Sequence, residues 1–200
     1  MAKAEFDALL QTAKHVHEQH PDVAAFCPFP TDLEWQGLAA NYLPPARLME
    51  NDTGLTSDTY AEFRDLFIAA SPHATWRETY RGTSIGDDFL ARFGCYELIG
   101  EGGQYNSTQM RSFVVYAPSG LWYPWHHHPA EELYLILAGE AEFLAEGKPT
   151  RTLRPGDTAF HAPNQSHAME TYDKPVLAYV LWRGDLKTPP MLSDIDGILM

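Results

Sequence analysis

The chain has 200 residues and a formal net charge of −13, with 44% hydrophobic and 12% aromatic residues. Its length predicts one domain, or one domain with an extension. The acidic balance argues against binding to nucleic acid, which needs a basic face, and no apolar run reaches the roughly 18 residues of a membrane span.

The first third of the chain, residues 1–72, is predicted to be a helical extension packed on the remaining domain. Apolar residues recur at helical spacing from Phe6 to Val16. Proline and capping signals divide the region further. We expect one helix that ends before Pro21, one that opens at the capping box of residues 31–34 and is broken or kinked at Pro44-Pro45, and one that Ser57 caps and Ser71-Pro72 ends.

Residues 73–200 are predicted to form the main domain, which is mainly β and makes one structural unit with the extension. Short aromatic and β-branched runs alternate there with turns rich in Gly, Pro and Asp. Eight short strands with tight connections predict a jelly-roll or barrel. We place the strands near 74–80, 88–98, 110–117, 121–128, 131–138, 140–146, 157–162 and 174–183. The tail from Lys187 is expected to lie as a strap on the surface.

Histidines and carboxylates are concentrated in one stretch, residues 125–134. Because a strand alternates its side chains between two faces, His126 and His128 are predicted to point to the same side. Glu132 and Tyr134 share a side by the same parity. One tight bend at Pro129 can therefore bring two imidazoles, a carboxylate and a phenol together.

A third imidazole, that of His167, can reach the same place. If residues 156–157 form a hairpin turn, the chain returns antiparallel and carries His167 back to this pocket. Three imidazoles and one carboxylate suit one divalent metal ion such as Zn, Fe, Mn or Ni. The predicted metal ligands are His126, His128, Glu132 and His167. The other histidines, His161 among them, are interpreted as surface residues or as satisfied core residues.

This spacing resembles the first motif of the cupin superfamily, in which each position has a counterpart here. The matching residues are Gly120, His126, His128, Glu132 and Gly139. The second cupin motif matches less well, because Asn164 replaces a glycine and Thr171 replaces an asparagine. Asparagine tolerates the left-handed conformation, so the turn is expected to survive. The resemblance implies a single, jelly-roll-like cupin β-barrel.

A narrower resemblance concerns residues 123–134, which are similar to the bacterial cupin-type dimethylsulfoniopropionate lyases of the DddQ type. It implies a carbon–sulfur lyase that splits dimethylsulfoniopropionate into dimethyl sulfide and acrylate by β-elimination. It also implies that Tyr134 and Tyr123 are catalytic, and that both of them contact the substrate together with Trp182.

The residues suit that chemistry. A divalent cation lowers the pKa of a neighbouring phenol, so Tyr134 becomes a credible general base for the proton beside the substrate carboxylate. Aromatic faces can hold the sulfonium by cation–π attraction, as Tyr123 or Trp182 could. For Trp122 and Trp125 we favour ordinary packing.

Two other functions stay open. An Fe(II)-dependent cupin dioxygenase would use the same ligands, and a non-enzymatic cupin would only bind a small molecule. The expected partner is a small zwitterionic substrate, with no nucleic acid and no membrane, and a homodimer is left open. Cys27 and Cys95 show no disulfide framework, and the N-terminus lacks the apolar core of a signal peptide. A cytoplasmic location is therefore expected.

Overall fold

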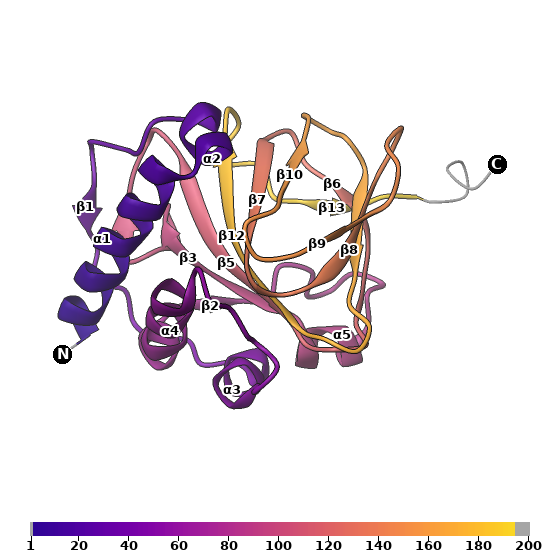
Figure 1. The fold of residues 1–200 in the computed structure, drawn as a ribbon, viewed down its shortest axis with the longest axis horizontal. Coiled ribbons are helices and arrows are strands. Elements are labelled where there is room, and N and C mark those ends of the chain that lie inside the picture. The colour runs from indigo at the N-terminus through magenta and orange to yellow at the C-terminus, as the bar shows by residue number, and fades with distance from the viewer. Residues whose placement is uncertain (1, 195–200) are drawn as a thin grey trace.

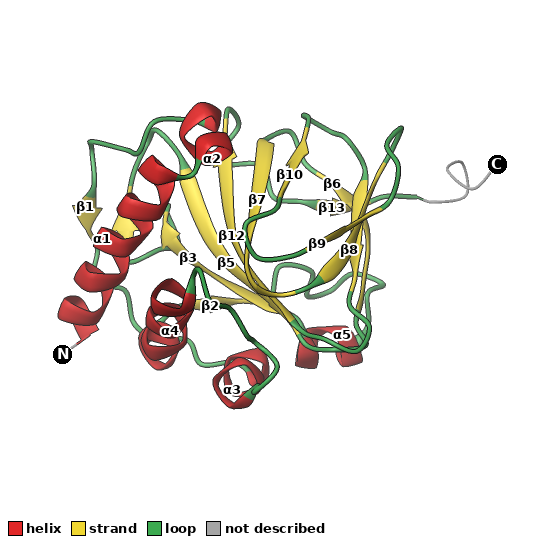
Figure 2. Cartoon of the chain, in the orientation of Figure 1, coloured by secondary structure: helices red, strands yellow, loops and turns green. Residues whose placement is uncertain are grey.

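The computed structural model describes residues 2–194 (Figures 1 and 2). Its helices are α1 (Ala2–Gln19), α2 (Pro21–Phe26), α3 (Pro44–Asn51), α4 (Ala61–Ala70), the short 3-10 helix η1 (Ser71–His73) and α5 (Asp87–Arg92). Its strands are β1 (Glu34–Trp35), β2 (Trp76–Arg77), β3 (Gly94–Ile99), β4 (Tyr105–Asn106), β5 (Arg111–Ala117), β6 (Trp122–His127), β7 (Glu131–Gly139), β8 (Ala141–Ala145), β9 (Arg151–Leu153), β10 (Thr158–His161), β11 (His167–Glu170), β12 (Val176–Arg183) and β13 (Met191–Leu192). Among these residues no helix is long and apolar enough to cross a membrane.

The strands form two sheets that pack against each other. The first has the order β1-β4-β3-β5-β12-β7-β10, with β2 also paired to β3, and the second has the order β13-β6-β11-β8-β9. One hydrophobic core contains side chains of both sheets, such as Ile136 and Val180 of the first and Phe143 and Met169 of the second. The predicted mainly-β class is confirmed, and within residues 2–194 the two sheets pack face to face rather than joining into one hydrogen-bonded, closed barrel.

Helices α1 to α4 cover the outer face of the first sheet, as Figure 1 shows for α1 and α4, whereas α5 adds Phe89 to the core between the sheets. Side chains of β7 alternate between two cores: Leu133 and Leu135 join the helices, whereas Tyr134 and Ile136 face the second sheet. Both faces of β7 are therefore buried, which explains its nearly continuous apolar sequence. Helices α1 to α4 therefore bury one face of β7 without lying between the two sheets.

Prolines begin helices in this chain rather than breaking them. The first helix ends before Pro21 as predicted, and α2 starts with that proline at its first position. In the same way α3 starts at Pro44, so the prediction of a helix broken there is wrong. Proline fits the first helical position because its missing N–H would be unpaired there in any case.

The capping box of residues 31–34 opens no helix, which is a second correction. The Asp32 carboxylate accepts hydrogen bonds from the Ser107 hydroxyl (2.6 Å) and the Thr108 N–H (2.8 Å) instead. Glu34 continues as strand β1 and pairs with Asn106. Hydrogen bonds from Ser107 and Thr108, which lie far along the chain, thus take the place of the helix cap that residues 31–34 would have formed.

The predicted strand over 88–98 is a helix and a strand joined end to end. Helix α5 occupies residues 87–92 and β3 begins at Gly94. Asp87 and Asp88 lie in the first turn of α5, where negative charge favours a helix. Five strands of two to four residues were not predicted, namely β1, β4, β9, β11 and β13.

Substituting His17 is expected to change how stability depends on pH. Its Nε2–H donates to the Cys27 carbonyl (2.7 Å), and burial lowers the pKa of His17 below 6.5. The unfolded chain therefore binds a proton first as pH falls, so the stability that neutral His17 contributes is complete above pH 6.5 and is lost as pH falls through the folded pKa. Urea unfolding between about pH 7.5 and 5 should show a shallower loss in His17→Gln than in the original chain. If the free energy of unfolding changed equally with pH in both proteins, this prediction would be wrong.

Candidate metal centre

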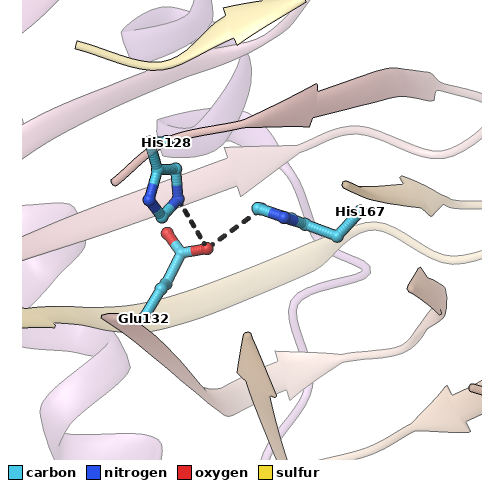
Figure 3. A group of neighbouring side chains, drawn as sticks. All are labelled: His128, Glu132 and His167. Atoms are coloured by element: carbon cyan, nitrogen blue, oxygen red, sulfur yellow. Dashed lines mark hydrogen bonds and ion pairs between the residues drawn. The ribbon is translucent and has the colours of Figure 1, made fainter. Parts of the chain in front are cut away.

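Three of the four predicted ligands meet at one point, as Figure 3 shows for His128, Glu132 and His167. The Nε2 atom of His128 lies 3.2 Å from Oε2 of Glu132, and the Nε2 atom of His167 lies 3.0 Å from the same oxygen. All three residues are buried. His128 directly follows β6, Glu132 lies on β7, and His167 begins β11, which runs antiparallel to β6 with His126 as the register partner of His167.

The other ring nitrogen of each histidine is held by the backbone. Nδ1 of His128 lies 3.0 Å from the Ala130 carbonyl oxygen, and Nδ1 of His167 lies 2.9 Å from that of Gln165. A carbonyl can only accept, so Nδ1 carries the proton and Nε2 presents a lone pair. Two lone pairs then face one carboxylate oxygen, an arrangement that a cation at their centre stabilises. The residues present therefore fit one divalent metal ion.

Burial and the mutual attraction of Glu132 and the two histidines decide which of these three side chains is charged. Burial alone would raise the pKa of Glu132, yet His128 and His167 together hold it well below its usual range. Burial would lower the pKa of His128, but the Glu132 charge raises it. Glu132 is thus a carboxylate, which is the form that binds a metal.

His126 lies beside the cluster, with its ring centroid 4.1 Å from that of His167. Its Nδ1 atom is also held by a backbone carbonyl, that of Pro124, at 2.8 Å. Burial holds the pKa of His126 well below 6.5, so the ring is neutral and its Nε2 can act as a donor to a metal. Its membership of the ligand set stays a prediction.

A β-bulge in β6 places Tyr123 on the same side as His126, although parity separates them. His126 pairs with His167 and Tyr123 pairs with Met169, so three steps along β6 oppose two steps along β11. The Tyr123 ring then stacks on His126, with centroids 4.1 Å apart and planes at 16°. Simple alternation could not give this geometry.

The remaining predicted site residues line one pocket beside Glu132. Tyr134 and Trp182 of the first sheet lie in its wall, and Tyr123 of the second sheet lies there too. The indole N–H of Trp182 donates to Oε1 of Glu132 (2.7 Å), so Trp182 orients the carboxylate. Burial, followed by the Glu132 charge, raises the pKa of Tyr134 well above 10, which keeps its phenol protonated unless a cation lies near.

The C-terminal segment closes part of this pocket. Pro189 and Pro190 line it, and β13 continues as a strand on β6. Arg111 holds the segment by donating to the Leu186 carbonyl (2.7 Å). The strap predicted from Lys187 is therefore present over 187–194, and its last residues, 195–200, lie outside the described residues.

Sequence reasoning missed Tyr80, Arg111 and His161. The Tyr80 hydroxyl hydrogen-bonds to that of Tyr123 (2.7 Å). A strand is predicted over 74–80, but β2 covers only Trp76–Arg77, and Tyr80 lies in the turn that follows. His161 was interpreted as surface or satisfied core, which is wrong: it is buried against His167 and neither ring nitrogen has a hydrogen-bond partner among the described residues. Strand alternation with Ala159 could have indicated that it faces inward. Trp122 is 40% exposed, so it is not a packed core residue.

The cupin turns are formed as their residues suggest. Gly120, Gly139 and Gly156 all have positive φ, at 65°, 72° and 94°. Asn164 has a φ of 59° and so adopts the left-handed conformation expected of a glycine replacement. Thr171 stands where the motif has asparagine, and its hydroxyl both accepts from the Leu121 N–H and donates to the Pro118 carbonyl. The altered second motif therefore still fixes its loop.

Similarity to known proteins extends over nearly the whole chain. Residues 39–178 match the dimethylsulfoniopropionate lyase family. The chain is 52% identical over 192 residues to dimethylsulfoniopropionate lyase DddQ of Ruegeria pomeroyi, covering 96% of each protein. The crystal structure of DddQ from that organism superposes with a TM-score of 0.94 at 51% identity, covering 97% of this chain and 98% of that one. A structure from work on the lyases RdDddP and RnDddQII gives a TM-score of 0.93 at 39% identity, with coverage of 97% and 100%. This chain belongs to the dimethylsulfoniopropionate lyase family.

Proposed function

We propose that this protein cleaves dimethylsulfoniopropionate to dimethyl sulfide and acrylate at a single divalent metal ion. The observation that carries the proposal is the convergence of two Nε2 lone pairs on one buried carboxylate oxygen, beside a tyrosine-lined pocket. Membership of the lyase family supports the reaction. His128, Glu132 and His167, with His126, would hold the ion.

The chain's own residues would perform the elimination as follows. Tyr134, as phenolate, takes the proton from the carbon beside the substrate carboxylate. The electron pair of that C–H bond forms the C=C bond of acrylate, and the C–S bond breaks so that dimethyl sulfide leaves as a neutral thioether. When bound, the metal supplies the positive charge that favours the phenolate and stabilises charge on the substrate carboxylate. The proton ends on the Tyr134 oxygen.

Aromatic side chains would bind the sulfonium end of the substrate. Phe93, Phe113 and Tyr123 line the pocket together with Trp182. Their ring faces attract a cation that has no hydrogen-bond donor. The Trp182 ring already contacts the Arg111 guanidinium (5.5 Å from the ring centroid) and the His128 ring (centroids 4.2 Å apart). The Phe113 ring likewise faces the guanidinium groups of Arg111 (5.0 Å) and Arg77 (5.8 Å). We therefore assign the sulfonium chiefly to Tyr123 and Phe93, with Phe113 and Trp182 at the edge of the substrate site.

The first experiment is an assay of metal-loaded protein with dimethylsulfoniopropionate, in which headspace dimethyl sulfide is measured by gas chromatography. We expect production that stops when a chelator removes the ion and returns when Zn, Fe or Mn is restored. The identity of the ion follows from which of these restores most activity. Oxygen consumption without dimethyl sulfide would instead support the Fe(II)-dependent dioxygenase, and metal binding without either product would support a non-enzymatic binding protein.

Two finer points stay predictions. The ion is Zn, Fe or Mn, because nitrogen and carboxylate donors accept all three. A cytoplasmic location is also expected, and the two unpaired, buried cysteines Cys27 and Cys95 agree with a reducing compartment. A homodimer is left open.

A further inference from the structure

Histidines of the candidate metal centre share one packing pattern. The ring of Tyr123 covers His126, with centroids 4.1 Å apart and planes at 16°. The ring of Trp182 covers His128, with centroids 4.2 Å apart and planes at 34°. Each imidazole is thus supported twice, by a backbone carbonyl at Nδ1 and by an aromatic ring on its face.

The third histidine, His167, has the same two supports. Its Nδ1 is held by the Gln165 carbonyl, and its ring is covered by His161, with centroids 4.0 Å apart and planes at 12°. This contact is the shortest and the most nearly parallel of the three. His161 comes from β10, where it lies opposite Glu132 of β7, and only 2% of it is exposed.

His161 contributes its ring face rather than its nitrogens. Neither Nδ1 nor Nε2 has a hydrogen-bond partner among residues 2–194. The edge of the ring instead packs against Tyr134, with centroids 5.8 Å apart and planes at 84°. A flat, buried ring in this position blocks rotation of the His167 imidazole about its Cβ–Cγ bond and keeps its Nε2 directed at Glu132.

We propose that His161 is a positioning residue of the metal centre, which holds His167 in its metal-binding orientation by face-to-face stacking. The proposal rests on the metal centre described under the proposed function, but not on turnover. Residues that orient a metal ligand typically change affinity by about 10–100-fold when they are removed. The flatness of the side chain, not its polarity, is what the site requires.

The test compares two apolar substitutions of similar size. His161→Phe keeps a flat ring and removes both nitrogens, whereas His161→Leu fills the space without a ring. We expect His161→Leu to weaken Zn²⁺ binding about tenfold, measured by competition with a chromophoric chelator, and to alter the visible absorption of the Co²⁺-loaded protein. His161→Phe should stay within about threefold of the original affinity and keep the Co²⁺ spectrum.

Thermal unfolding of the metal-free proteins separates positioning from packing. Both variants should unfold within a few degrees of the original chain when metal is absent, because neither loses a hydrogen bond. His15→Leu, a substitution on the exposed face of α1, serves as the control and should change neither affinity nor spectrum.

Two results would overturn the proposal. Unchanged Zn²⁺ affinity and an unchanged Co²⁺ spectrum in His161→Leu would show that the ring orients nothing. Equal losses in His161→Phe and His161→Leu would show that the nitrogens, not the ring face, are needed. An original chain that binds no Zn²⁺ would overturn this proposal together with the proposed function, whereas one that binds Zn²⁺ without cleaving the substrate would overturn only the latter.

Discussion

Replacing Tyr134 by phenylalanine is expected to lower kcat for dimethylsulfoniopropionate cleavage by about 10²–10⁴-fold, the usual contribution of a general base. The substitution removes one oxygen from a residue that lines the pocket beside Glu132. The ring, which packs against Phe143 and His161, is kept, so the fold and the metal affinity should be unchanged. Headspace dimethyl sulfide and the bound metal content should be measured on the same sample.

The matched control for this substitution is Tyr172→Phe. Tyr172 is 54% exposed and hydrogen-bonds to Glu142 and Glu170 on the surface of the second sheet. It should keep full activity. A Tyr134→Phe variant that retained its metal and lost less than about tenfold in kcat would place the base elsewhere, and Tyr123 would be tested next.

Replacing Glu132 by glutamine is expected to weaken Zn²⁺ binding by more than about 100-fold, because loss of a direct ligand exceeds the 10–100-fold effect of losing a residue that only orients one. Glutamine has nearly the same size, and its carbonyl oxygen can still accept from the Trp182 N–H. The change therefore removes the charge on which both Nε2 atoms converge while it preserves the packing. Dimethyl sulfide production should fall with the bound metal.

Chelator competition at equal protein concentrations measures this affinity, and Glu146→Gln, on the exposed loop after β8, is the control. The metal-free Glu132→Gln protein should remain folded, as judged by its thermal unfolding. If it bound one ion per chain as tightly as the original protein, Glu132 would have to be removed from the ligand set.

The sequence predicts those parts of the site that depend on the regular alternation of side chains along a strand. Two residues of separation place His126 and His128 on one side, and the fixed spacing to Glu132 is kept because one short bend connects β6 to β7. His167 also reaches the site, on β11 antiparallel to β6. The expected hairpin at residues 156–157 does not form, because β9 and β10 on either side of it belong to different sheets. The placement of these side chains depends on their alternation along a strand and on strand pairing, and the spacing of the residues in the sequence indicates the alternation.

Contacts that depend on irregular backbone could not be predicted in the same way. Tyr123 reaches the interior only through a bulge, and a bulge has no periodic signature. Tyr80 reaches Tyr123 from the turn after β2, where its ring also packs against Phe89 of α5. His161 required knowledge of which strand lies beside Glu132, and strand order is a property of the whole fold.

The bulge in β6 also changes which kinds of mutation this site can accept during evolution. Two residues lie between Tyr123 and His126, and the bulge gives β6 one residue more than β11 over this stretch. Tyr123 and His126 face the same way because of that extra residue, and one or three intervening residues would separate them. The side chains at 124 and 125 are only half-buried, so their identities can drift without moving either ring. The number of residues between Tyr123 and His126 cannot change, because one insertion or deletion would turn one of these two side chains towards solvent. Libraries for altered substrate preference should therefore vary the identities of these two residues and preserve the length of the segment.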